Sequence, residues 1–255
     1  MITSTQNERA KYIRSLVRRR VRQREGRFVV EGTRLVDETA RAGLRPALVF
    51  YTEAWEKTPA GQRLLPSLLQ ADEGAWLVSE AVMGACTETQ TPQGVLAVLP
   101  FVQFPPRPGL LLILDRVRDP GNLGTILRSA EAASVGHVLL SPGTVDHYNP
   151  KVVRGAMGAH FRLPVISLDW PAIAEQAGRR AVWLADAAGE LSYDAVDWTQ
   201  PSALIVGGEA AGAGQEAAVL ATGRVSIPMA GGAESLNAAM AATVILFEAA
   251  RQQRG

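Results

Sequence analysis

Three glycine-bearing segments in the second half of the chain combine an adaptable backbone with side chains that can bind or orient a ligand. The first covers residues 115–128 and reads DRVRDPGNLGTILR. Its Pro-Gly-Asn turn precedes a helix that Asn122 can cap, and Arg128 follows Gly124 by about one helical turn. Because a cation near a helix N-terminus opposes the helix dipole, Arg128 indicates an anionic partner such as a phosphate.

The second segment, LIVGGEAAG over residues 204–212, places a glycine loop after an apolar strand. Glycines at this point let a ligand touch the backbone. The spacing is not that of the dinucleotide fingerprint G-x-G-x-x-G, and the lysine of a phosphate-binding loop is missing. Since Glu209 would repel phosphates, a neutral or cationic ligand such as S-adenosylmethionine fits better. A plain turn with a solvated glutamate is the competing interpretation.

The third segment, VSIPMAGGAESLN over residues 225–237, again joins a strand to a helix through glycines. Ser235 can cap the last helix and leave backbone amides free at its start. Ligands in α/β sheets lie at the carboxyl ends of the strands. We therefore expect the three segments to be the natural place for a binding site.

The elements that must position these segments form two α/β blocks, which are separated by three prolines and a glycine in residues 104–109. In residues 1–103 the patterns predict strands at 28–30, 47–51, 76–78 and 94–99 and helices at 9–24, 33–42, 60–71 and 80–85. In residues 110–255 they predict strands at 110–114, 137–141, 163–167, 181–185, 203–206 and 225–228 and helices at 124–134, 150–158 and 235–252. The continuous apolar run at 110–114 is typical of a strand buried in a parallel sheet.

Composition excludes several classes of protein. The chain has 255 residues, of which 47% are hydrophobic and 20% charged, and it contains no apolar run long enough for a membrane span. A single cysteine, Cys86, cannot form an internal disulfide. The three histidines lack the grouping of a metal site, and no G-x-S-x-G elbow is present. We expect a globular, cytoplasmic protein without a metal.

Positive charge is concentrated near the N-terminus although the net charge is only +1. Residues 9–24 hold eight basic and no acidic residues, which is typical of a surface that binds a polyanion. A solvated helix face and an arginine-rich transit peptide are the alternatives, but the strand that follows directly argues against the latter. The basic residues are Arg9, Lys11, Arg14, Arg18, Arg19, Arg20, Arg22 and Arg24.

Together and in this order, the three segments resemble the motifs of the SpoU (TrmH-like) family of SPOUT methyltransferases. The residues that carry the resemblance are Asn122, Gly124, Arg128, Gly207, Glu209, Gly212, Ile227, Pro228, Met229, Ser235, Leu236 and Asn237. Residues 27–32 resemble the small substrate-binding domain that is fused to many members. Two departures are Gly208, where the family usually has asparagine, and Gly155-Ala156, where a small hydroxyl residue often follows Arg154.

The resemblance implies a C-terminal SPOUT domain (residues 110–255) with a parallel sheet and a trefoil knot, preceded by a small α/β domain (residues 1–103) that binds RNA. It implies a homodimer that uses S-adenosylmethionine to methylate a ribose 2′-hydroxyl in RNA. The fused domain favours ribosomal RNA of the large subunit. A tRNA ribose methyltransferase and a non-catalytic ribosome-assembly factor stay open, whereas a dinucleotide-dependent oxidoreductase is disfavoured by the missing fingerprint.

The resemblance also assigns roles to individual residues. The catalytic set is Arg128, Asn122, Glu209, Ser235 and Asn237. The cofactor-binding set is Gly207, Gly208, Glu209, Gly212, Ile227, Pro228, Met229, Ser235, Leu236 and Asn237. The expected RNA contacts are the eight basic residues of 9–24 together with Arg116, Arg118 and Arg154.

Overall fold

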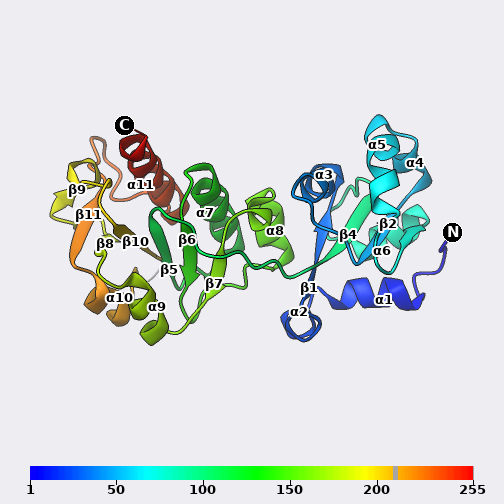
Figure 1. Cartoon of the computed structure of the whole chain (residues 1–255), viewed down its shortest axis with the longest axis horizontal. Coiled ribbons are helices and arrows are strands. Elements are labelled where there is room, and N and C mark those ends of the chain that lie inside the picture. The colour runs from blue at the N-terminus through cyan, green and yellow to red at the C-terminus, as the bar shows by residue number, and fades with distance from the viewer. Residues whose placement is uncertain (209–211, 255) are drawn as a thin grey trace. The chain divides into compact units, whose positions relative to one another are not determined.

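The chain folds into two compact units in a computed structural model that describes residues 1–208 and 212–254 (Figure 1). The first unit comprises Met1–Val102 and Tyr148–Phe161, and the second comprises Gln103–His147 and Arg162–Gly255. Residues 148–161 thus pack with the first unit although they lie inside the range 110–255. The reason is aromatic packing, since the Tyr148 ring stacks on Phe101 with centroids 4.0 Å apart and its hydroxyl bonds to the Val102 backbone.

The first unit is built on a four-stranded sheet with the order β1-β4-β2-β3. Strand β4 is antiparallel to both neighbours, while β2 and β3 are parallel. The elements are α1 (Glu8–Ser15), α2 (Arg19–Glu25), β1 (Arg27–Glu31), α3 (Thr33–Arg41), β2 (Leu48–Tyr51), α4 (Glu53–Glu56), α5 (Pro59–Leu68), β3 (Ala75–Leu77), α6 (Glu80–Cys86), β4 (Val95–Pro100), α8 (Pro150–Ala156) and the 3₁₀ turn Ala159–Phe161.

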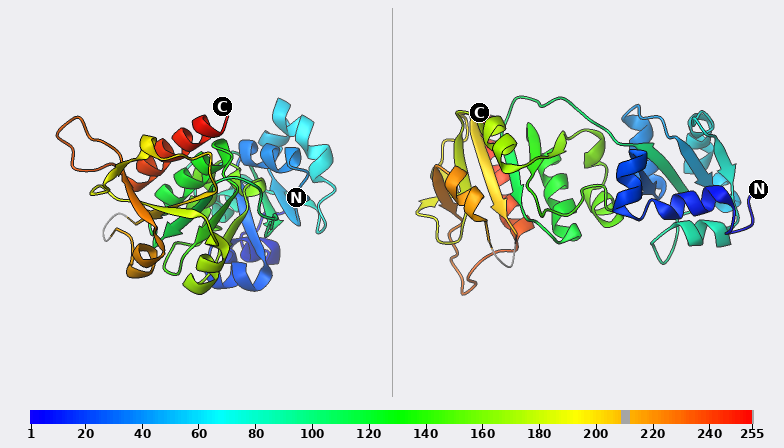
Figure 2. Two further views of the ribbon diagram at one scale, coloured as in Figure 1. Left: turned by 60° about the vertical axis from the view of Figure 1, so that its left-hand side comes forward. Right: turned by 90° about the horizontal axis from the view of Figure 1, so that it is seen from below.

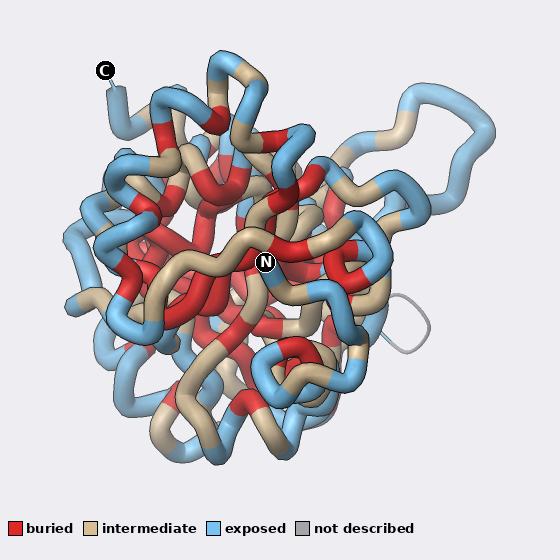
Figure 3. The backbone as a smooth tube through the Cα atoms, turned by 90° about the vertical axis from the view of Figure 1, so that its right-hand side faces the viewer, coloured by how far each residue is buried: buried red, intermediate tan, exposed pale blue. Residues whose placement is uncertain are grey.

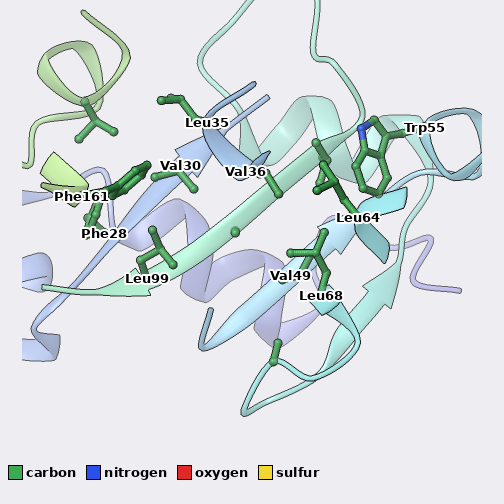
Figure 4. Packing of buried hydrophobic residues seen from close by; sticks show 14 of the residues in the cluster. Phe28, Val30, Leu35, Val36, Val49, Trp55, Leu64, Leu68, Leu99 and Phe161 are labelled. Atoms are coloured by element: carbon green, nitrogen blue, oxygen red, sulfur yellow. The ribbon is translucent and has the colours of Figure 1, made fainter. Parts of the chain in front are cut away.

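Both faces of this sheet are covered, because side chains of a strand alternate between its two sides. Val95 and Leu99 of β4 belong to the layer that contains Phe28 and Trp55 (Figure 4). The intervening Leu96 and Val98 pack with α1 and α6 on the other side. Figure 3 looks onto this unit and shows buried segments enclosed by helices with exposed outer sides.

The basic stretch predicted as one helix over residues 9–24 is two helices, α1 and α2. Arg22 folds back at their junction and donates from Nη1 to the carbonyl oxygens of Leu16 at 2.8 Å and Val17 at 2.6 Å. It therefore satisfies carbonyls that the end of α1 leaves unpaired. With 2% of its surface exposed, Arg22 cannot contact RNA, and its assignment as an RNA contact was wrong.

The second unit contains a seven-stranded sheet with the order β7-β6-β5-β10-β8-β11-β9. All its neighbouring strands are parallel, which confirms the predicted α/β class. The elements are β5 (Leu111–Asp115), α7 (Pro120–Ala132), β6 (His137–Leu140), β7 (Val165–Ser167), α9 (Trp170–Ala177), β8 (Ala181–Ala185), β9 (Leu191–Ser192), the 3₁₀ turn Tyr193–Ala195, β10 (Ser202–Gly207), α10 (Gln215–Leu220), β11 (Gly223–Ser226) and α11 (Ala238–Gln253).

Helices cover both faces of this sheet, as a parallel sheet requires. Ile173 of α9 and Ala217 of α10 pack with Ile113 and Ile205 of the central strands. Helices α7 and α11 lie side by side (Figures 1 and 2). Within the described residues, no helix has both the length and the apolar character that crossing a membrane would demand.

Two helix starts differ from those predicted from the sequence. Helix α7 begins at Pro120, four residues before the predicted start. Its cap is Asp119, whose carboxylate accepts a hydrogen bond from the backbone N–H of Asn122 at 2.8 Å. Helix α11 begins at Ala238 and its cap is Asn237 rather than Ser235. Both predicted caps were therefore wrong, because a better-placed Asp or Asn stands at each helix start. The side chain of Asn122 is consequently free for other contacts.

The second unit should lose stability as the pH falls below about 6.5, because burial lowers the pKa of His137 and so disfavours its charged form. Neither ring nitrogen has a hydrogen-bond partner among the described residues. Burial lowers the pKa of His137, and the charge of Arg180 lowers it further. The unfolded chain therefore binds this proton more readily, so the stabilisation is complete above the unfolded pKa and declines below it.

Urea unfolding at a series of pH values between about 7.5 and 5.5 measures this effect. The variant His137→Phe is the control, since it keeps a buried ring and removes the titrating group. We expect its stability to depend less on pH than that of the wild type. Equal pH dependence in both proteins would contradict the assignment.

Candidate functional site

A cavity of about 550 Å³ opens at the carboxyl ends of β8, β10 and β11, three adjacent strands of the seven-stranded sheet. Its size is that of a small-molecule site. Parallel strands end at the same edge of a sheet, so loops that are distant in sequence meet there. The cavity is therefore the candidate binding site of the second unit.

Most of the predicted cofactor residues line this cavity. It brings together Gly207, Gly208, Gly212, Ile227, Met229, Ser235, Leu236 and Asn237. Pro228 is exposed and is not among the lining residues, while Glu209 lies outside the described residues. Two of the three glycine-bearing segments, those after β10 and β11, thus form a single site.

Sequence reasoning missed a third wall of the cavity, which comes from the end of β8. This wall consists of residues 184–187, and Ala238, Ala241 and Ile245 of α11 add to it. A signal was present, because the apolar strand β8 leads into Asp-Ala-Ala-Gly in the same way as the other strands lead into their loops. The α11 residues could not be found by such a rule, since they belong to a regular helix.

Close backbone packing explains the glycines of the loop after β10. Gly208 and Gly212 pair in an antiparallel bridge that closes the base of the loop. A Cβ atom on Gly207 would lie 2.5 Å from the Ala213 nitrogen, and Gly212 has a φ of 58°. Larger residues would clash at the first position and be strained at the second.

The charge of the cavity favours a cationic ligand. Among the described lining residues are two carboxylates, Asp186 and Glu234, and no lysine, arginine or histidine. Asp186 is held by Arg224 at 3.0 Å and by the Ala188 amide at 2.9 Å. Without a basic lining residue in the described part of the site, a phosphate-bearing ligand would be poorly compensated.

The first glycine-bearing segment reaches the cavity through a pair of asparagines. The Asn237 amide donates from Nδ2 to Oδ1 of Asn122 at 3.1 Å, which links the starts of α11 and α7. A second link joins Ser129 and Thr243, whose hydroxyl oxygens are 2.7 Å apart. Asn122 therefore lies one side chain away from the cavity wall.

Arg128 lies farther along α7 and is exposed. It is six positions from Asn122, which corresponds to about 9 Å along the helix axis. It is not a lining residue, and it forms no ion pair or hydrogen bond with the described part of the chain. Its guanidinium is thus free to bind an external anion.

The predicted RNA contacts differ in how freely they can bind. Arg18, Arg19 and Arg20 are exposed and have no ionic partner within the residues that the structure describes, and the same holds for Arg118. The other predicted contacts already interact with residues of this chain. Arg9 lies over the Trp76 ring at 3.9 Å, and Arg14 donates a hydrogen bond to the Thr5 carbonyl. Four form ion pairs: Lys11 with Glu8, Arg24 with Glu25, Arg116 with Asp115 and Arg154 with Glu88.

The described residues do not support a metal site or a reactive cysteine. They contain no group of His, Cys, Asp and Glu that could hold a metal ion. Burial raises the pKa of the Cys86 thiol to about 11, so this cysteine is not a reactive thiolate.

Comparison with known proteins matches both parts of the chain. A family model described as the SpoU rRNA Methylase family covers residues 109–247, and one described as the MRM3-like substrate binding domain covers residues 7–97. The chain is 34% identical to the 23S rRNA (guanosine(2553)-2′-O)-methyltransferase RlmP of Bacillus subtilis, with 96% of this chain and 97% of that protein aligned.

Two further similarities concern other bacteria. The chain is 33% identical to the 23S rRNA (uridine(2479)-2′-O)-methyltransferase of Streptomyces viridochromogenes, over 92% of this chain and 86% of that protein. An AdoMet-bound rRNA methyltransferase structure from Sinorhizobium meliloti aligns with 98% of this chain and 97% of its own, at 31% identity and a TM-score of 0.86. The similarity therefore includes both units of the fold.

Replacing Asn237 with alanine should lower the free energy of unfolding by about 1 kcal/mol, because the oxygen that caps α11 is lost. The variant Asn237→Ser keeps a capping oxygen and loses the amide that binds Asn122. We expect it to retain most of the stability in chemical denaturation. Equal losses in the two variants would show that the contact with Asn122, and not the cap, carries the effect.

Proposed function

The chain belongs to the SpoU rRNA methylase family, and on this premise we propose that it transfers the methyl group of S-adenosylmethionine to a ribose 2′-hydroxyl of ribosomal RNA. The observation that carries the proposal is the cavity at the ends of β8, β10 and β11, which the family's glycine loops line. Similarity to an AdoMet-bound rRNA methyltransferase over 98% of the chain supports it.

The cavity suits S-adenosylmethionine in size, polarity and charge. Apolar side chains such as Val206, Ile227 and Leu236 offer surfaces for an adenine ring, and the strand ends expose backbone groups. Of the two lining carboxylates, Glu234 has no ionic partner among the described residues and can complement a cation. When bound, S-adenosylmethionine supplies a methyl group activated by the positive charge on its sulfur.

We assign Arg128 to the ribose and its phosphate. An arginine stays protonated in proteins and is therefore a poor general base. Its guanidinium can instead clamp the adjacent phosphate with two hydrogen bonds and stabilise the negative charge that develops on the ribose oxygen. The hydroxyl proton would pass to water as the oxygen takes the methyl group, and S-adenosylhomocysteine would be the leaving group. Asn122, Ser235 and Asn237 would position the nucleotide, together with Glu209, which lies outside the described residues.

We propose that residues 1–103 form a domain that binds the RNA substrate and that residues 110–255 form the domain that carries out methyl transfer. Residues 104–109 would be the linker between these two domains. The match of residues 7–97 to a substrate binding domain supports this division. We favour large-subunit ribosomal RNA over tRNA, because two relatives are named for 23S rRNA. Their names specify different nucleotides, so the proposal extends to the RNA and not to the position.

We also propose that two copies associate through α11. Met240 is 62% exposed and Phe247 is 43% exposed, and the partly buried Val244 lies between them on the same helix face. An apolar stripe of this kind on a surface helix is typical of a protein interface. The trefoil knot and the cytoplasmic location stay predictions.

Transfer of labelled methyl groups from S-adenosylmethionine to total RNA lacking the modification tests the function, with analysis of the modified nucleoside. A 2′-O-methylated nucleoside in large-subunit ribosomal RNA is the expected product. Finding the label in tRNA instead would show that tRNA, and not ribosomal RNA, is the substrate. Absence of cofactor binding, measured by the shift in melting temperature, would instead favour a non-catalytic RNA-binding factor.

Arg128→Ala should lower turnover by about 10²-fold or more, because a preorganised cation at the reacting oxygen is lost. The affinity for S-adenosylmethionine should stay nearly unchanged, since Arg128 does not line the cavity. Single-turnover methylation and calorimetric titration measure the two quantities separately. Turnover at the wild-type rate would refute the assigned role.

Replacing Arg18, Arg19 and Arg20 with glutamine should flatten the salt dependence of RNA binding. Each lost phosphate contact reduces the slope of log K against log salt by about 0.7 to 0.9. Filter binding across a salt series gives the slope. The control is Arg179→Gln, another exposed arginine that lies outside the basic cluster. An unchanged slope in the triple variant would exclude these residues from the RNA surface.

The double variant Met240→Glu, Phe247→Glu should shift the protein from dimer to monomer in sedimentation equilibrium, because it places charges on the apolar stripe. The folded unit should survive, since both side chains are exposed. Val219→Glu on α10 is the matched control, as Val219 is 79% exposed and lies on another helix. A wild-type protein that is monomeric would dismiss the proposed interface.

A further inference from the structure

The carboxylate of Asp115 is buried at the end of β5, next to the base of the glycine loop that lines the cofactor cavity. One of its oxygens accepts from the Ser141 hydroxyl at 2.7 Å, and the other accepts from the Gly214 amide at 2.6 Å. Gly214 closes the loop that follows β10. The carboxylate therefore anchors the end of this loop to the neighbouring strand.

A buried carboxylate needs compensation for its charge. Arg116 supplies it, since its Nε lies 3.5 Å from Oδ2 of Asp115, the same oxygen that binds Gly214. No other cation pairs with Asp115 among the residues that the structure describes. Arg116 thus pairs with the carboxylate that holds the loop.

The backbone of Arg116 is held in an unusual conformation. Its φ is 54°, in the left-handed region that residues other than glycine seldom adopt. Such a conformation persists only where the surroundings enforce it. Glycines leave room for the side chain on two sides, because a Cβ on Gly214 would lie 3.0 Å from Nη2 and one on Gly143 would lie 3.3 Å from Cγ.

The same conformation turns the Arg116 carbonyl toward the cavity loop. A Cβ atom on Gly208 would lie 2.4 Å from this carbonyl oxygen, which no side chain can tolerate. Gly208 lines the cavity, so the backbone of Arg116 directly supports its wall. Side chain and backbone of one residue therefore contact both ends of the loop.

We infer that Arg116 is a positioning residue for the cofactor loop, acting through Asp115 and Gly208, rather than the RNA contact that the sequence suggests. The neighbouring Arg118 offers the contrast, because it is exposed and has no ionic partner in the described part of the chain. The inference rests on the proposed function in that S-adenosylmethionine is taken as the ligand of the cavity.

The test is calorimetric titration of S-adenosylmethionine into the full-length wild type and the variants Arg116→Gln, Arg116→Lys and Arg118→Gln. Loss of the charge should weaken cofactor binding about tenfold in Arg116→Gln, because the ion pair with the buried Asp115 carboxylate is lost. Lysine should restore most of the affinity. RNA affinity and its salt slope should stay unchanged in Arg116→Gln, whereas Arg118→Gln should alter only these two quantities.

Hydrogen exchange at the Gly214 amide gives a second readout, which we expect to be faster in Arg116→Gln. Should the glutamine variant unfold, Arg116→Met keeps the packing against Gly143 and removes only the charge. Wild-type cofactor affinity in these variants, or a weaker RNA affinity with a flatter salt slope, would overturn the inference. If the wild type itself binds no S-adenosylmethionine, the proposed function fails and the inference falls with it.

Discussion

The buried carboxylate of Asp115 is the interaction on which the rest of the site depends. A charge with 1% exposure is tolerated only when its oxygens are fully bonded. Its partners come from the ends of β6 and β10, since Ser141 follows the one and Gly214 closes the loop after the other. Satisfying one carboxylate therefore draws separate loops together at the edge of the sheet where the cavity lies.

At the helix starts around the cavity, side chains likewise provide hydrogen-bond partners for polar backbone groups. Asp119 and Asn237 satisfy the first amides of α7 and α11, which would otherwise lack partners. Because Asp119 takes the capping role, the Asn122 side chain can accept from Asn237. One residue pair thus links the two helices whose ends carry the proposed nucleotide-binding residues.

The two proposed binding surfaces of the chain carry opposite charges, each of which suits its own ligand. The described lining of the cavity is acidic and suits a sulfonium, whereas residues 9–24 are basic and suit a phosphate backbone. The net charge of +1 conceals this division. Within the basic cluster, burial separates the roles further, since Arg22 stabilises the end of α1 and Arg18, Arg19 and Arg20 remain exposed.

The sequence by itself determined the parallel α/β class, the family and the two glycine loops that line the cavity, because apolar runs and glycine loops are patterns within short stretches of the chain. It could not determine which residue caps a helix, since Asp119 and Asn122 are both suitable and only the position of the first helical turn decides between them. Nor could it separate Arg22 and Arg116 from the other arginines. Their roles depend on backbone carbonyls and a carboxylate that tertiary folding brings beside them, and a charge pattern along the chain carries no record of that burial.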